Sequence, residues 1–270
     1  GEKGNVSATF NFQAGAKAAG ANHLVSFEAG LRENMVPQDA TAVVESANLA
    51  ELVVDFESFL LEHQLGGQVQ LQGNQATFSL IGKAAHGSTP SKGVNAATFL
   101  AKYLHRFEFD QAGAESFLHL LADHLHQDFE GVNLGVAHRD PVMQELTMNV
   151  GLVNYRDDKG GSIVANFRYP KGTDPEKMAA QTAQRLAGHD LSVEWGEFKE
   201  PHYVSVDDPM VKELLAVYEE QTGLEGHEMT IGGGTYGRLM PRGVAYGALF
   251  PDSIDTMHQA NEFIAIDDLL

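Results

Sequence analysis

The sequence predicts an α/β fold, because strand-like and helix-like segments alternate along the whole chain. Apolar residues from Leu49 to Leu60 recur at the spacing of an amphipathic helix. The order strand, strand, helix, strand, strand that ends near residue 82 returns loosely from residue 132 to residue 199. This repetition predicts a duplicated α+β sandwich over residues 1–200, with halves of approximately 1–82 and 132–199.

The individual elements follow from local patterns. Val6 to Phe12 is strand-like, and the helix that begins at Leu49 is expected to end at Gly66 and Gly67, since glycine readily ends helices. Further helices are expected over 95–107, 114–126, 175–187 and 209–222. Further strands are expected over 69–71, 76–81, 146–153, 163–169, 191–195 and 244–249. Pro201 and residues 204–209 indicate a linker, so a separate segment, 201–270, is expected to begin near residue 200.

Composition excludes several classes of function. The 270 residues include 18 basic and 37 acidic side chains, giving a formal charge of -19 without a Lys/Arg cluster, which disfavours a nucleic-acid partner. No apolar run reaches the ~20 residues of a membrane helix, so a soluble, cytoplasmic protein is expected. The chain contains no cysteine, so His, Asp and Glu are the strong metal ligands available.

The two ends of the sequence suggest a fragment of a longer protein. The chain begins at Gly1 without an initiator methionine, and it ends at Leu270 just after acids of the kind that start a helix.

Two segments place a histidine in a pattern with chemical meaning. Residues 82–90, Gly-Lys-Ala-Ala-His-Gly-Ser-Thr-Pro, put His86 where a strand passes into a loop, so its side chain can reach outward. Taken alone, this loop is better explained as a turn with a surface histidine. Residues 250–264 carry His258 in the run Asp-Thr-Met-His-Gln-Ala-Asn-Glu.

Three further segments are candidates for substrate binding. The glycine-rich run from Ile231 to Arg238 lacks the Lys-Ser or Lys-Thr of a phosphate loop, but its small residues allow an anion to approach the backbone N–H groups. A tight turn is the alternative explanation. Asn34 lies in Arg-Glu-Asn-Met-Val-Pro after a strand, and Arg168 lies near the end of the strand 163–169.

Together these motifs resemble the co-catalytic zinc metallopeptidases that include aminoacylases, glutamate carboxypeptidases, desuccinylases and carnosinase-like dipeptidases. The residues of these motifs most resemble those of the PepV-type bacterial dipeptidases, which hydrolyse Xaa-His and related dipeptides. The resemblance covers essentially the whole chain, and it implies a lid domain followed by the C-terminal part of an α/β catalytic domain.

The resemblance also implies roles for individual residues. His86 would polarise the scissile carbonyl from the lid, and His258 would be the final zinc ligand. Asn34, Arg168 and the turn Gly233-Gly234-Thr235 would bind the carboxylate of a small dipeptide substrate. The intact parent protein would hold two zinc ions and, because its long lid looks internally doubled, would be a monomer.

The remaining zinc ligands of the resembling family have no counterpart in this chain. His138-Arg139-Asp140 has the family's His-x-Asp spacing, but no Glu-Glu pair follows at a suitable distance, so it is rejected as a ligand pair. His119, His124 and His126 are interpreted as ordinary surface histidines, since offsets of five and seven match no regular α-helical ligand spacing. The chain alone is therefore expected to hold no stoichiometric zinc pair and to be inactive.

Three hypotheses remain open at the level of the sequence. The first is a fragment of a zinc dipeptidase. The second keeps the fold and changes the substrate to an N-acyl amino acid or N-succinyl-diaminopimelate. The third is a binding module without catalysis.

Overall fold

The computed structural model describes residues 1–247, 249–254, 256 and 261–268. They form two compact units, each described here by itself. The sheet unit comprises Glu2–His202 and Thr230–Gly233, and the C-terminal unit comprises Gly1, Tyr203–Met229 and Gly234–Leu270.

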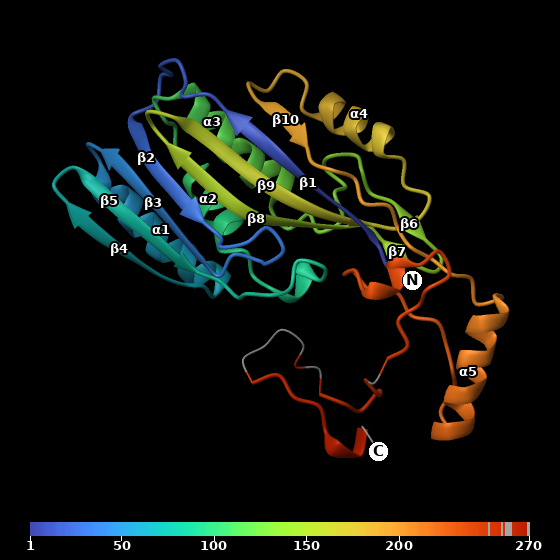
Figure 1. Ribbon diagram of the computed structural model, residues 1–270. Coiled ribbons are helices and arrows are strands. Elements are labelled where there is room, and N and C mark those ends of the chain that lie inside the picture. The colour runs from blue at the N-terminus through green and yellow to red at the C-terminus, as the bar shows by residue number, and fades with distance from the viewer. Residues whose placement is uncertain (248, 255, 257–260, 269–270) are drawn as a thin grey trace. The chain divides into compact units, whose positions relative to one another are not determined.

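The sheet unit is built on an eight-stranded sheet in the order β10-β1-β9-β8-β2-β3-β5-β4, in which every pairing is antiparallel (Figure 1). Its strands are β1 (Gly4–Phe12), β2 (Asn22–Ala29), β3 (Asp39–Ser46), β4 (Gly66–Gln72), β5 (Gln75–Ile81), β8 (Thr147–Arg156), β9 (Gly160–Tyr169) and β10 (Ser192–Trp195). The short strands β6 (Arg139–Asp140) and β7 (Gln144–Glu145) form a separate pair. The predicted mixed α/β fold is thus confirmed.

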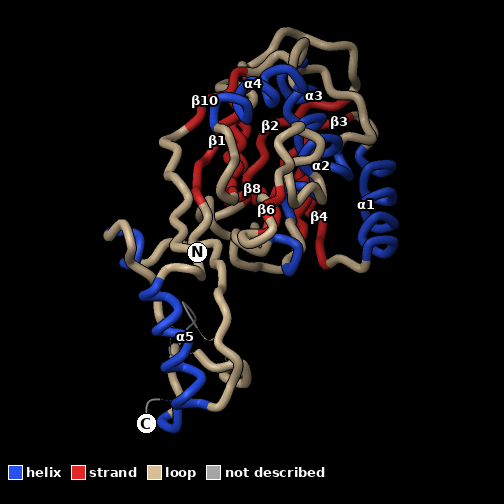
Figure 2. Tube along the Cα trace, turned by 90° about the vertical axis from the view of Figure 1, so that its right-hand side faces the viewer, coloured by secondary structure: helices blue, strands red, loops and turns tan. Residues whose placement is uncertain are grey.

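Helices cover one face of this sheet. They are α1 (Leu49–His63), α2 (Ala96–Leu104), α3 (Ala112–His119) and α4 (Pro175–Arg185). A short 3-10 helix, η1 (Pro90–Lys92), lies between β5 and α2 in the chain. Figure 2 shows α1, α2 and α3 gathered on the same side of the strands. Because side chains alternate along a strand, β1 buries Val6, Ala8, Phe10 and Phe12 against them.

The other face of the sheet carries polar side chains between β8, β9 and β1. We call it the polar face and define it by Asn5, Ser7, Asn149, Asn166 and Arg168. Residues paired across antiparallel strands share a face, and the register pairs Ser7 with Asn166, Asn166 with Asn149, and Asn5 with Arg168.

The helix predicted over 114–126 changes its winding halfway. It begins as α3 and continues as a π-helical segment, η2 (Leu120–Leu125). A π-helix brings residues five apart into line, whereas an α-helix brings residues three and four apart into line. The helix from Leu49 also ends differently from the prediction, since Gln64 adopts the left-handed conformation at its end and Gly66 and Gly67 begin β4.

The sheet consists of two similar halves. In one, β3 and β4 both pair with β5 and are joined through α1; in the other, β9 and β10 both pair with β1 and are joined through α4. The halves meet where β2 pairs with β8. We propose that they derive from a duplication in which the second half takes its central strand, β1, from the start of the chain.

The C-terminal unit contains α5 (Pro209–Thr222), η3 (Tyr236–Leu239) and η4 (Ile266–Asp268). Asp208 caps α5 by accepting a hydrogen bond from the N–H of Met210, and the guanidinium of Arg242 donates two further bonds to the same carboxylate. The strand predicted over 244–249 is wrong for residues 244–247 and 249, which are irregular. No helix in the described part of the chain is both long and apolar enough to cross a membrane.

Candidate functional site

The loops that carry Asn34 and His86 are extensions of two paired strands. β3 and β5 pair up to Asp39 and Ile81, and the hydrogen bonds continue beyond them. The N–H of Gly82 donates to the carbonyl of Gln38 (2.7 Å), that of Val36 to Ala85 (2.9 Å), and that of Gly87 to Asn34 (2.8 Å). This continued register sets the two predicted site residues on neighbouring backbone segments.

The tautomer of His86 follows from its contacts. The backbone N–H of Ser88 donates to Nδ1 of His86 at 3.1 Å, and the hydroxyl of Ser88 lies 2.7 Å from the same nitrogen. Because a backbone N–H can only donate, Nδ1 is an acceptor, and a neutral ring therefore carries its proton on Nε2. The side chain of His86 is exposed, and its donor nitrogen is therefore Nε2.

The Asn34 loop is held onto the polar face by Asn149. The amide nitrogen of Asn149, which is 1% exposed, donates to the carbonyls of Glu33 (2.9 Å) and Met35 (3.0 Å), on either side of Asn34. The hydroxyl of Ser7 donates to the Glu33 carboxylate at 2.8 Å. Within the described residues the side-chain amide of Asn34 itself forms no hydrogen bond, so a fixed backbone presents a half-exposed amide.

Arg168 lies on the same polar face and is 8% exposed. Its β9 neighbour Asn166 donates to the side chains of Asn5 (2.8 Å) and Ser7 (2.9 Å), which continue the network under the Asn34 loop. Asn34, His86 and Arg168 thus belong to one unit, with Asn34 and Arg168 on one face of its sheet.

The glycine-rich turn is shared between the two units. Gly232 and Gly233 belong to the sheet unit, where a Cβ on Gly232 would lie 2.4 Å from the Cβ of Ser88, next to His86. Gly234 and Thr235 belong to the C-terminal unit, where the Thr235 hydroxyl accepts a hydrogen bond from the N–H of Gly237. His258 lies outside the described residues.

His138 and Asp140 have structural contacts. Asp140 accepts hydrogen bonds from the Lys171 ammonium (2.6 Å) and from the N–H groups of Val142 and Met143, which together hold the pKa of its carboxyl below the usual value, Lys171 most of all. Across the residues that the structure describes, groups of three or more His, Asp or Glu ligand atoms within 4.8 Å occur twice, both around His119 and neither with His86. The described residues therefore do not form a two-zinc centre.

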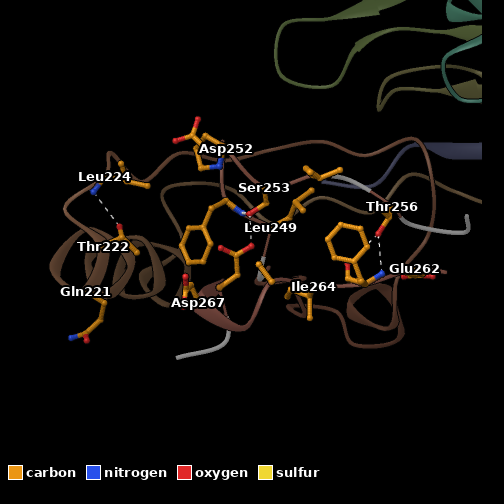
Figure 3. A pocket seen from close by; sticks show the side chains of 16 residues that line it. Gln221, Thr222, Leu224, Leu249, Asp252, Ser253, Thr256, Glu262, Ile264 and Asp267 are labelled. Atoms are coloured by element: carbon orange, nitrogen blue, oxygen red, sulfur yellow. Dashed lines mark hydrogen bonds between the residues drawn. The ribbon is translucent and has the colours of Figure 1, made fainter.

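Each unit contains a cavity. A pocket of about 230 Å³ lies beside the Asn34 loop and is lined mainly by apolar residues such as Leu31, Met35 and Pro37, which is room for a single side chain. A cavity of about 950 Å³ in the C-terminal unit is lined by residues between Gln221 and Asp268 (Figure 3). Among the residues that the structure describes, the predicted site residues do not line the second cavity.

Sequence reasoning missed the polar side chains beneath the Asn34 loop. The signal was present in β1, where Asn5, Ser7, Thr9 and Asn11 alternate with apolar residues. Asn149 and Asn166 each have apolar neighbours on both sides in their strands, and a buried amide in such a position usually has hydrogen-bond partners.

Gly87 offers a test of how closely the two loops must approach. A Cβ at this position would lie 2.9 Å from the carbonyl carbon and oxygen of Asn34, so Gly87→Ala forces the loops apart. We expect a loss of about 1–3 kcal/mol in the free energy of unfolding, measured by denaturant titration. Gly66→Ala, whose Cβ meets its nearest neighbour at 3.5 Å, is the matched control. Equal stability of the two variants would contradict the close packing of the loops.

Comparisons with known proteins identify the family of the chain. Residues 4–270 match the model of peptidase family M20/M25/M40, and the chain belongs to this family. It is 42% identical over 271 residues to the beta-Ala-Xaa dipeptidase of Lactobacillus delbrueckii subsp. lactis, an alignment that covers 100% of this chain and 57% of that protein. The chain spans about half the length of the curated relatives it matches. The resemblance to metallopeptidases with dipeptidase relatives is confirmed.

Two solved structures are similar at low identity. Aminoacylhistidine dipeptidase from Vibrio alginolyticus is 14% identical with a TM-score of 0.40, and the match covers 86% of this chain and 51% of that one. The M20 family metallo-carboxypeptidase Sso-CP2 from Sulfolobus solfataricus is 16% identical with a TM-score of 0.42, and the match covers 99% of this chain and 55% of that one.

Proposed function

We propose that the protein encoded by the gene is a zinc-dependent dipeptidase, in which this chain supplies the substrate-binding and carbonyl-polarising groups. The observation that carries the proposal is the Nε2–H donor of His86, fixed by Ser88 on a loop hydrogen-bonded to the Asn34 loop. A family match over residues 4–270 and a dipeptidase relative at 42% identity support it.

His86 acts on the carbonyl of the scissile bond. As that bond is attacked, negative charge develops on the carbonyl oxygen, and a hydrogen bond from Nε2–H strengthens with the charge. Because Nδ1 already accepts from Ser88, the ring does not need to change tautomer before it donates. His86 therefore lowers the barrier rather than tightening substrate binding.

Asn34, Arg168 and the turn Gly233-Gly234-Thr235 bind the substrate's terminal carboxylate. A guanidinium presents paired N–H donors that match a carboxylate, and the buried setting of Arg168 strengthens such a bond. The Asn34 amide and the backbone N–H groups of the glycine turn add neutral donors. A carboxylate held at a fixed distance from His86 restricts the substrate to short peptides.

Zinc is the metal we propose, with two ions in the complete protein and with His258 as one ligand. The metal would supply an activated water for attack on the peptide bond. The described residues do not form this centre, so the chain by itself is expected to be inactive.

Substitution of Arg168 tests the carboxylate contact. Arg168→Ala removes a charged hydrogen bond worth about 1.5–3 kcal/mol, so KM for a dipeptide should rise roughly 10- to 100-fold while kcat changes less. Arg168→Lys keeps the charge and loses the paired donors, so it should restore part of the binding. An unchanged KM in a folded Arg168→Ala protein would contradict the assignment.

Substrate comparison tests the activity. The gene-encoded protein should hydrolyse β-Ala-His and Leu-Gly, lose this activity on chelation and regain it with zinc. Preference for N-succinyl or N-acyl amino acids would assign the amidohydrolase alternative, and no hydrolysis of either class would favour a binding module.

A further inference from the structure

Four histidines from separate parts of the sequence meet on the helix-covered side of the sheet unit. His105 follows α2, His119 ends α3, His124 lies in η2, and His189 lies between α4 and β10. The ring centroid of His119 lies 5.4 Å from that of His105, 5.3 Å from that of His124 and 5.0 Å from that of His189. This cluster lies on the face opposite Asn34 and Arg168, and it is not part of the proposed peptidase site.

The π-helical segment explains why sequence spacing did not reveal the cluster. An offset of five residues separates His119 from His124, which in an α-helix places them on different faces. In η2 the winding is i to i+5, so the two rings come together at a centroid distance of 5.3 Å. The expectation that His119 and His124 share no helical face is therefore wrong, although both side chains are partly exposed.

His126, the third member of that sequence group, has a different environment. Its ring packs edge-on against Phe99, its Nδ1 lies 3.1 Å from the Thr98 hydroxyl, and burial lowers its pKa to about 4. It contributes to packing and does not belong to the cluster.

Three of the imidazoles have the arrangement of metal ligands. One nitrogen from each of His119, His124 and His189 lies within 4.8 Å of the others, and all three side chains are partly exposed. Tetrahedral zinc with Zn–N bonds of about 2.0–2.1 Å needs nitrogens about 3.3 Å apart, which small side-chain rotations would provide. Three imidazoles leave the fourth position for water.

Asp123 supplies the orienting contact that such sites use. Its carboxylate lies 3.0 Å from Nδ1 of His119, which leaves Nε2 as the nitrogen for a metal. A carboxylate bound to the far nitrogen of a metal-binding histidine fixes the ring and raises its basicity. The alternative group of His105, His119 and Asp123 is less suitable, because Lys102 lies 3.0 Å from the same carboxylate and competes with a cation.

Charged side chains lie close to the three imidazoles. Arg185 faces His124, and the charge of Asp123 offsets its repulsion of a cation. Neutral imidazole is the form that binds transition metals.

We propose that His119, His124 and His189 form a second zinc site, with Asp123 as the residue that positions His119. A metal held there would join the end of α3 and η2 to the segment between α4 and β10, and so would act as a structural clip. The proposal does not depend on the peptidase activity, because its ligands are all described residues outside the proposed active site.

The test is zinc binding by the full 270-residue chain. After removal of metal, competition with a chromophoric chelator should give one tightly bound zinc ion per chain, and four-coordinate Co²⁺ should give its intense visible absorption. The double variant His124→Gln/His189→Gln should weaken binding at least about 100-fold, and Asp123→Asn about 10- to 100-fold. His227→Gln, an exposed histidine in the C-terminal unit, should leave binding unchanged.

Thermal unfolding provides a second readout that does not involve activity. Zinc should raise the Tm of the wild-type chain and of His227→Gln, but not that of the double variant, because a ligand that binds only the folded state stabilises it. Circular dichroism without metal checks that each variant is folded. The proposal would be overturned if the wild-type chain bound zinc no more tightly than the folded double variant.

Discussion

Replacement of His86 by alanine is expected to lower kcat for dipeptide hydrolysis by about 10²–10³-fold, with little change in KM. The effect falls on kcat because the bond from Nε2–H becomes strong only as charge develops on the carbonyl oxygen. Zinc content should remain that of the wild-type protein, since His86 is assigned no ligand role. Steady-state kinetics and metal analysis of the gene-encoded protein give all three quantities.

Two further variants separate this role from a merely structural one. Ser88→Ala removes the hydroxyl next to Nδ1 but keeps the backbone N–H, so the tautomer is retained and kcat should fall far less than in His86→Ala. His227→Ala, at an exposed position in the C-terminal unit, should behave as wild type. If His86→Ala retains kcat within threefold of wild type, His86 has no role in the chemical step. The substitution should then lower the free energy of unfolding by at most ~0.5 kcal/mol.

The sequence predicted the elements whose signals are local. The apolar spacing from Leu49 gave α1, and the segment 209–222 coincides with α5. The segment predicted as strand 244–249 is apolar but irregular at its described residues, because a strand also needs a partner to receive its hydrogen bonds, which composition cannot show. The π-helical turn was missed for a similar reason, since nothing in the residues 120–125 marks a change from i+4 to i+5 winding.

The sequence indicated the residues proposed to contact the substrate but not the side chains that hold their loops in place. His86, Asn34 and Arg168 stand in motifs that a family resemblance can identify. Ser7 and Asn149 are far from Asn34 in sequence, and they reach its loop only because β8 and β1 lie beside it in the folded sheet. Such contacts depend on the order of strands in the sheet, and the local patterns of a single sequence do not reveal that order.

Replacement of Asn149 by alanine is expected to reduce kcat/KM by about 10²-fold, although this residue does not contact the substrate. Its amide makes two hydrogen bonds to the backbone on either side of Asn34, at 2.9 and 3.0 Å. Without them the loop is free to shift, and a displacement of ~1 Å at a substrate-binding group can cost about 10²-fold in rate. The lost bonds also leave two partly buried carbonyls without this donor, which should reduce the free energy of unfolding by about 1–3 kcal/mol.

Two further variants distinguish a positioning role for Asn149 from a loss of stability alone. Asn154→Ala, an exposed amide on the same strand, should leave both stability and kinetics near wild type. Ser7→Ala, which removes the other contact to the loop through Glu33, should also lower kcat/KM, by a smaller factor. Kinetics measured well below the Tm of every variant decide the matter: if Asn149→Ala is less stable but keeps wild-type kcat/KM while folded, the network beneath Asn34 serves the fold and does not position the substrate.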